Sequence, residues 1–281
     1  MMTIRFHVGR ACAVALALVL VACAAPTPTP NPNPRPSATP SQETRTHLDA
    51  ARAALKTNQL DQALSEAQAA VGSDPNNAEA HFLLGNVFSQ LAGANADETE
   101  RRANLAKAVD AYLTAIKLDA GYDAAYTNLA TVYYQNGQFD EAQKRVETAL
   151  KINPSDAVSH YVLGTIHLQR DPAQVPETWD KAQQEFEAAL ELDPSLGAAH
   201  TALANVYLFK VENQKALEHA QKGVELTRGA PNPYSYWALA QAQCALGDRA
   251  GTAASIDAID GLKPTDPLFI QQVQALAERC K

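Results

Sequence analysis

A repeat of 34 residues constrains this chain more than any other feature, and it is clearest between Asp123 and Asp156. Apolar residues recur at helical spacing in each half of that segment, and Gly137 lies between the two halves. Pro154 follows the second half, where it would end a helix. A pair of short helices exposes an apolar face that only a neighbouring pair can cover, so such units must stack. The period therefore predicts an all-α array of helix pairs.

The same pattern occurs six times, and small residues at three fixed places carry it. Gly or Ala at the eighth, twentieth and twenty-seventh places lets paired helices approach closely, while larger residues fill the gaps between them. The first unit is weaker because alanines replace larger residues, and the sixth departs at Thr252, where alanine is usual. The predicted units span residues 44–77, 78–122, 123–156, 157–196, 197–230 and 233–266, and residues 267–281 form a capping helix.

This pattern resembles the tetratricopeptide repeat family, whose repeats have the same length. In the unit that begins at Asp123, the resemblance rests on Tyr126, Leu129, Ala130 and Tyr133 in the first helix, with matching residues in the second. The resemblance implies a right-handed α-solenoid of six helix pairs with a closing helix. It also implies a scaffold that binds proteins or peptides and needs no cofactor.

The sequence offers no catalytic or metal-binding pattern that competes with a scaffold. No GxxxxGK[ST], GxGxxG or GxSxG occurs, and the acidic pairs lie where helices are expected to begin. Four histidines occupy the fourth place of their units, which stacking separates by a whole helix pair: His47, His81, His160 and His200. No HExxH and no histidine pair at i, i+4 occurs, so we expect neither an enzyme nor a metal site.

Partner binding is expected on the first helices, at places that share a face pointing away from the packed one. The candidates are Phe82, Asn86, Thr127, Thr131, Tyr134, Tyr161, Thr165, Leu168, Thr201, Asn205, Leu208, Tyr234, Trp237 and Gln241. This stripe is aromatic and amide-bearing, and only Arg45, Arg52 and Lys56 of the first unit add positive charge. A clamp for a terminal carboxylate is therefore disfavoured, and a peptide with apolar anchors is favoured. The alternative is that these aromatics pack against the insertions or the capping helix.

The first residues predict export and lipid anchoring. Arg5 and Arg10 precede an apolar run that is too short to span a bilayer but suits a signal peptide, residues 1–22. The segment from Leu20 to Cys23 resembles the lipobox of bacterial lipoproteins, which implies an acylated Cys23 in a cell membrane or outer membrane. Residues 23–43 are then a proline-rich linker that extends the folded part away from lipid. An ordinary secretion signal with an incidental cysteine is the alternative.

Charge and cysteine content narrow the partners. The formal charge of −8 makes nucleic acid an improbable partner. Cys244 and Cys280 remain as thiols, either bridged or separate. The combination is similar to pilus-secretin pilotins and to lipoprotein subunits of outer-membrane assembly machines. It favours a lipid-anchored scaffold in envelope or surface-structure assembly, with a small-molecule-binding lipoprotein that uses the aromatic groove as the alternative.

Overall fold

The computed structural model describes residues 40–94, 97–170 and 175–280, and within them every regular element is a helix. The predicted signal peptide and Cys23 lie outside the described residues, as does the linker up to residue 39. The helices are α2 (Gln42–Lys56), α3 (Leu60–Ser73), α4 (Ala78–Ala94), α5 (Glu98–Leu118), α6 (Asp123–Gln135), α7 (Phe139–Ile152), α8 (Ala157–Arg170), α9 (Val175–Leu192), α10 (Gly197–Phe209), α11 (Asn213–Leu226), α12 (Pro233–Ala245), α13 (Arg249–Gly261) and α14 (Pro267–Arg279). The predicted all-α class is confirmed.

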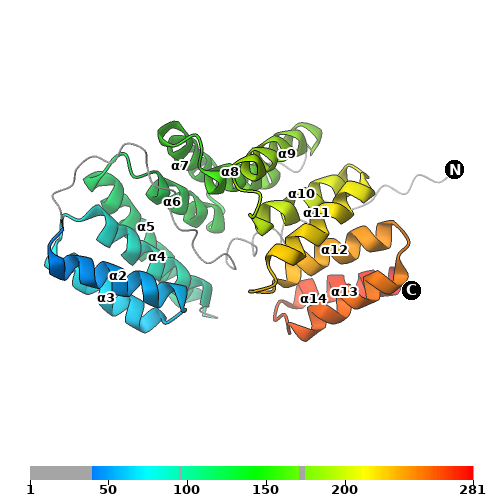
Figure 1. Cartoon of the computed structure of the whole chain (residues 1–281), viewed down its shortest axis with the longest axis horizontal. Coiled ribbons are helices and arrows are strands. Elements are labelled where there is room, and N and C mark those ends of the chain that lie inside the picture. The colour runs from blue at the N-terminus through cyan, green and yellow to red at the C-terminus, as the bar shows by residue number, and fades with distance from the viewer. Residues whose placement is uncertain (1–39, 95–96, 171–174, 281) are drawn as a thin grey trace. The chain divides into compact units, whose positions relative to one another are not determined.

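The described residues divide into two compact units, which we call the N-terminal unit (40–162) and the C-terminal unit (163–280). In the N-terminal unit α2 pairs with α3, α4 with α5 and α6 with α7, as the blue-to-green ribbons show (Figure 1). In the C-terminal unit α10 pairs with α11 and α12 with α13, and α14 packs against both α12 and α13. Consecutive first helices also touch, since α2 meets α4, α4 meets α6 and α10 meets α12.

Small residues allow these helices to approach each other. The alanines at the twentieth and twenty-seventh places of the first three units are completely buried: Ala63, Ala70, Ala108, Ala115, Ala142 and Ala149. The eighth place is tighter still, because a Cβ atom on Gly85 would lie 2.6 Å from the Tyr112 ring. Gly164 meets Phe186 in the same way, at 2.7 Å. An aromatic ring of the second helix thus lies directly on the backbone of the first in both pairs.

The turns inside the first, third, fifth and sixth units use one backbone conformation. Gly137 and Gly247 lie in the left-handed region, with φ of 73° and 78°, at the fifteenth place of the third and sixth units. Asn58 takes the same place in the first unit with φ of 55°, and Val211 takes it in the fifth with φ of 62°. Glycine and asparagine tolerate this conformation, whereas a β-branched residue there is strained.

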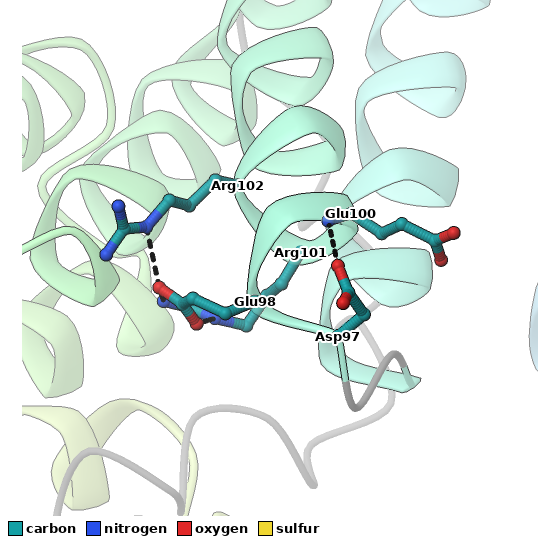
Figure 2. Close-up of polar contacts among 5 residues, drawn as sticks. All are labelled: Asp97, Glu98, Glu100, Arg101 and Arg102. Carbon is teal, nitrogen blue, oxygen red and sulfur yellow. Dashed lines mark hydrogen bonds and ion pairs between the residues drawn. The ribbon is translucent and has the colours of Figure 1, made fainter.

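The long helix α5 begins with a capped and charged first turn. Asp97 Oδ1 accepts a hydrogen bond from the Glu100 backbone N–H at 2.9 Å, which satisfies one free amide at the helix start (Figure 2). The Glu98 carboxylate is hydrogen-bonded by Arg101 and by Arg102, which lowers the pKa of Glu98 to about 2. These residues are on the surface, so the cluster sets where α5 begins and contributes little to overall stability.

The helix α14 covers the last repeat. Its apolar side is buried in a cluster with α12 and α13 that includes Trp237, Ile259, Phe269, Val273 and Leu276. Cys244 and Cys280 form a disulfide with Cα atoms 5.7 Å apart, joining α12 to the residue that follows α14. Among the described residues, no helix has both the length and the apolar character needed to cross a membrane.

Candidate peptide-binding surface

The structure changes the expected picture of the first helices, because none of the fourteen candidate residues is exposed. Nine are buried: Phe82, Asn86, Thr127, Tyr134, Tyr161, Thr165, Thr201, Asn205 and Trp237. Thr131, Leu168, Leu208, Tyr234 and Gln241 are half-buried. The expectation that these places point away from packed surfaces is therefore wrong for the nine. The reason is that consecutive first helices contact each other and cover much of that face.

The candidate threonines at the fifth place connect neighbouring first helices. Thr127 Oγ1 lies 2.6 Å from Ser159 Oγ, and Thr201 Oγ1 lies 3.1 Å from Ser235 Oγ. Each pair joins the fifth place of one unit to the third place of the next. All four hydroxyls are buried, so each is satisfied by its partner helix and not by solvent. These residues hold the repeats together.

The candidate aromatic residues also pack against other side chains of the fold. The Phe82 ring lies 4.9 Å from the Tyr122 ring and 6.0 Å from the Tyr112 ring, measured between centroids. Trp237 is 7% exposed and packs edge-on against Phe269 of α14, with centroids 5.8 Å apart. Trp237 therefore packs against the capping helix, which was the alternative to a place on the binding surface. A small-molecule groove lined by these rings has no support in their burial.

The fourth-place histidines have a defined contact at the junction between units. A ring nitrogen, Nε2, bonds the carbonyl of the proline six residues earlier, and the pairs are His81 with Pro75 (2.9 Å), His160 with Pro154 (3.1 Å) and His200 with Pro194 (3.2 Å). Since a carbonyl only accepts, Nε2 carries the proton. His47 differs, because its Nδ1 contacts Glu66 Oε2 at 2.7 Å.

A polar node on α4 and α6 is the best candidate for binding a peptide. Asn86 Oδ1 accepts two hydrogen bonds, from the Tyr112 hydroxyl at 2.8 Å and from Asn128 Nδ2 at 2.7 Å. Burial raises the pKa of Tyr112, which keeps its hydroxyl a donor. Asn128 is half-buried and was not among the sequence candidates. The signal that could have found it is an amide at the sixth place beside an amide at the ninth place of the preceding unit.

Charged residues of α2 and of the first turn of α4 neutralise one another. Arg52 donates to Asp49 Oδ1 at 2.6 Å and also to Glu79, while burial raises the pKa of the neighbouring Tyr122. Arg45 Nε donates to the Pro40 carbonyl at 3.0 Å. Two of the three cations expected on this face are thus already engaged. We call Arg52, Glu79, Asn86, Asn128 and Thr131 the amide surface.

The amide surface is a recognition surface in its chemistry. The half-buried carboxamide of Asn128 and hydroxyl of Thr131 can exchange hydrogen bonds with a polypeptide main chain, while the buried Asn86 orients Asn128. Across the described ranges, no group of three or more His, Cys, Asp or Glu side chains is arranged to hold a metal ion.

Comparison with known proteins agrees with this architecture. Two models described as Tetratricopeptide repeat match residues 48–123 and 101–166. Protein bimA of Emericella nidulans is 36% identical over 98 residues, which are 35% of this chain and 11% of that protein. Thus the chain spans about a tenth of this curated relative's length.

Solved structures show the same fold at low identity. PilF of Pseudomonas aeruginosa matches with a TM-score of 0.64 and 19% identity, over 83% of this chain and 97% of that one. The anaphase-promoting-complex assembly Cut9–Hcn1 matches with a TM-score of 0.71 and 16% identity, over 85% of this chain and 43% of that one. At such identities the likeness concerns the fold alone.

The repeat fold is that of a helical-repeat scaffold, a class that typically binds other proteins and is generally non-catalytic. The repeats over residues 48–166 are tetratricopeptide repeats.

Proposed function

We propose that this chain is a lipid-anchored scaffold of the cell envelope that holds a segment of a partner protein on the amide surface, in the assembly of the envelope or of a surface structure. The observation that carries the binding role is the Asn86–Asn128 node, in which two carboxamides from different repeats meet on one face. The anchoring and the envelope location rest on the sequence alone, through the apolar run and the lipobox-like segment that ends at Cys23.

The mode of recognition follows from what is accessible. The candidate rings of Phe82, Tyr134, Tyr161 and Trp237 are buried, so they are not apolar anchors for a partner. The amide of Asn128 and the hydroxyl-bearing side chain of Thr131 are half-buried and remain in reach of a partner. Such a surface suits an extended segment that is recognised mainly through its backbone, with its own side chains supplying specificity.

The test is affinity capture from an envelope extract with a photo-crosslinking residue in place of Thr131. A crosslinked partner peptide, identified by mass spectrometry, would give the partner and its binding segment. Asn128→Ala should weaken capture of that peptide by about 5-fold, because it removes a half-buried amide and one hydrogen bond contributes about 1 kcal/mol. Asn104→Ala is the matched control, since Asn104 is a half-buried amide on the second helix α5.

The two outcomes are distinct. Equal capture by the Asn128→Ala variant and the unmodified chain would exclude the amide surface as the binding site. Equal loss in the Asn104→Ala variant would show that the effect is general and does not belong to this surface.

A further inference from the structure

Two histidine rings face each other in the C-terminal unit. His200 lies at the fourth place of the fifth repeat, on α10, and His219 lies on α11, the second helix of the same repeat. Their Nδ1 atoms are 3.0 Å apart, their ring centroids are 5.1 Å apart, and the ring planes are inclined by 38°. Both side chains are half-buried, so this pair is in contact with solvent at its edge.

The protonation of His200 is fixed by its other nitrogen. His200 Nε2 lies 3.2 Å from the Pro194 carbonyl oxygen and must be the donor, so the neutral ring has a free lone pair on Nδ1. The proton between the two Nδ1 atoms therefore belongs to His219. Burial lowers the pKa of both rings, which favours the neutral form that binds metals. A histidine that donates one ring N–H to a backbone carbonyl is oriented as metal-binding histidines usually are.

We propose that His200 and His219 form a binding site for a divalent transition-metal ion such as Zn²⁺, with both Nδ1 atoms as ligands. Zn–N bonds of about 2.0–2.1 Å at a tetrahedral angle place two ligand nitrogens about 3.3 Å apart and their ring centroids about 5 Å apart. The rings already have that separation and need only tilt. When the metal binds, the His219 proton moves from Nδ1 to Nε2, so two N–metal bonds replace one hydrogen bond and no net proton is released.

Charges around the pair permit a cation. Glu218 and Glu187 both act on His219 in the direction that favours positive charge, whereas Lys222 opposes positive charge on His200. Glu187 also accepts a hydrogen bond from the Tyr207 hydroxyl at 3.2 Å, and the Tyr207 ring lies 5.4 Å from the His219 ring. Since no third His, Cys, Asp or Glu among the described residues joins the two histidines, water completes the coordination.

The first two repeats do not have this pair of histidines. In the first repeat the corresponding pair is His47 with Glu66, whose Nδ1 and Oε2 atoms are 2.7 Å apart. In the second repeat His81 makes the same bond to a proline carbonyl, but Ala111 occupies the place that corresponds to His219. The pair escapes the sequence patterns HExxH and His at i, i+4, because His219 faces His200 from the second helix of the same unit, 19 residues later.

The test is calorimetric titration of the chain with Zn²⁺, after removal of bound metal, together with nitrogen NMR of the imidazole rings. We expect one Zn²⁺ per chain and a coordination shift on the Nδ1 signals. His200→Gln and His219→Gln should each weaken binding at least about 10-fold. Glutamine at position 200 has a side-chain N–H that can still reach the Pro194 carbonyl, which separates loss of a ligand from loss of structure. His81→Ala is the matched control and should bind as the unmodified chain does.

Circular dichroism of each variant establishes that it is folded, and Zn²⁺ affinities are compared among folded variants. Unchanged Zn²⁺ affinity in both glutamine variants would overturn it, as would an equal loss in His81→Ala or a shift confined to Nε2 signals.

Discussion

Val211 is the residue whose backbone conformation is most at odds with its side chain. It has φ of 62° at the turn place where the third and sixth repeats have glycine, and it is 75% exposed. Left-handed backbone costs a residue with a side chain roughly 1–2 kcal/mol, and the exposed isopropyl group regains little of this by burial. Releasing this strain by Val211→Gly should stabilise the C-terminal unit by about 1 kcal/mol. The greater chain entropy of glycine in the unfolded state offsets part of this gain, so we expect a smaller net increase in the free energy of unfolding.

Urea denaturation followed by circular dichroism measures this change. The matched control is Leu246→Gly, an exposed apolar residue with φ of −93°, which has no strain to release and should lose stability. A lower denaturation midpoint for Val211→Gly would contradict the strain argument.

Trp237 is the residue for which the structure reverses the expected result of a mutation. As a partner-binding residue, Trp237 could be truncated without loss of folding, but its ring is buried against Phe269. We now expect Trp237→Ala to cost about 3–5 kcal/mol through lost burial and a cavity. Thermal denaturation measures this loss of stability. Leu268→Ala is the control, since Leu268 is 47% exposed on α14 and its truncation should change stability by under about 0.5 kcal/mol. An unchanged melting temperature for Trp237→Ala would contradict the core assignment and support a role of this ring in partner binding.

At the scale of elements, the Cys244–Cys280 disulfide holds the capping helix α14 on the last repeat. The bond closes a loop with a sequence separation of 36, for which the chain-entropy model gives about 3–4 kcal/mol. Cys280→Ser should therefore lower the free energy of unfolding of the C-terminal unit by that amount, and Cys244→Ser should do the same. The double variant should match either single variant, because both remove one bond. Thiol titration of the unfolded oxidised chain should find neither of these two cysteines free.

The histidine pair between α10 and α11 gives the C-terminal unit a pH dependence. Burial lowers the folded-state pKa of His200 and His219, whereas both titrate near 6.5 when unfolded. Below about pH 6.5 the unfolded chain binds protons that the folded chain does not, so stability falls as pH drops from 7 towards 5.5. Glu187 and Glu218 oppose this shift at His219, and Lys222 adds to it at His200. In the His200→Gln, His219→Gln double variant, the melting temperature measured with a chelator should vary less over this range.

At the scale of the whole molecule, the repeat period predicted where the helices lie, but it did not predict which side chains on their outer faces are buried. Apolar spacing reports which side a helix turns to its own partner, and the burial of Ala63, Ala142 and similar residues agrees with it. It does not report how much of the remaining face the next first helix covers, so the burial of Thr127 and Asn86 does not follow from the pattern. Contacts between residues at different places of neighbouring helices, such as Asn86 with Asn128 and His200 with His219, depend on packing that a repeat alignment does not contain.

The proposed lipid anchor would act at the scale of the whole molecule, because it would hold every repeat at a membrane through one residue. The chain carries a formal charge of −8, which repels anionic lipid, and retention would depend on acylation of Cys23. Two or more acyl chains give stable anchoring, whereas a single chain is marginal. Cys23→Ser removes the thiol that acylation requires, so we expect the variant to lack the lipid mass and to leave the membrane fraction. Cys12→Ser is the matched control, since this cysteine lies inside the predicted signal and should change neither mass nor fractionation. A Cys23→Ser chain that stays with the membrane at unchanged mass would show that Cys23 is not the anchor.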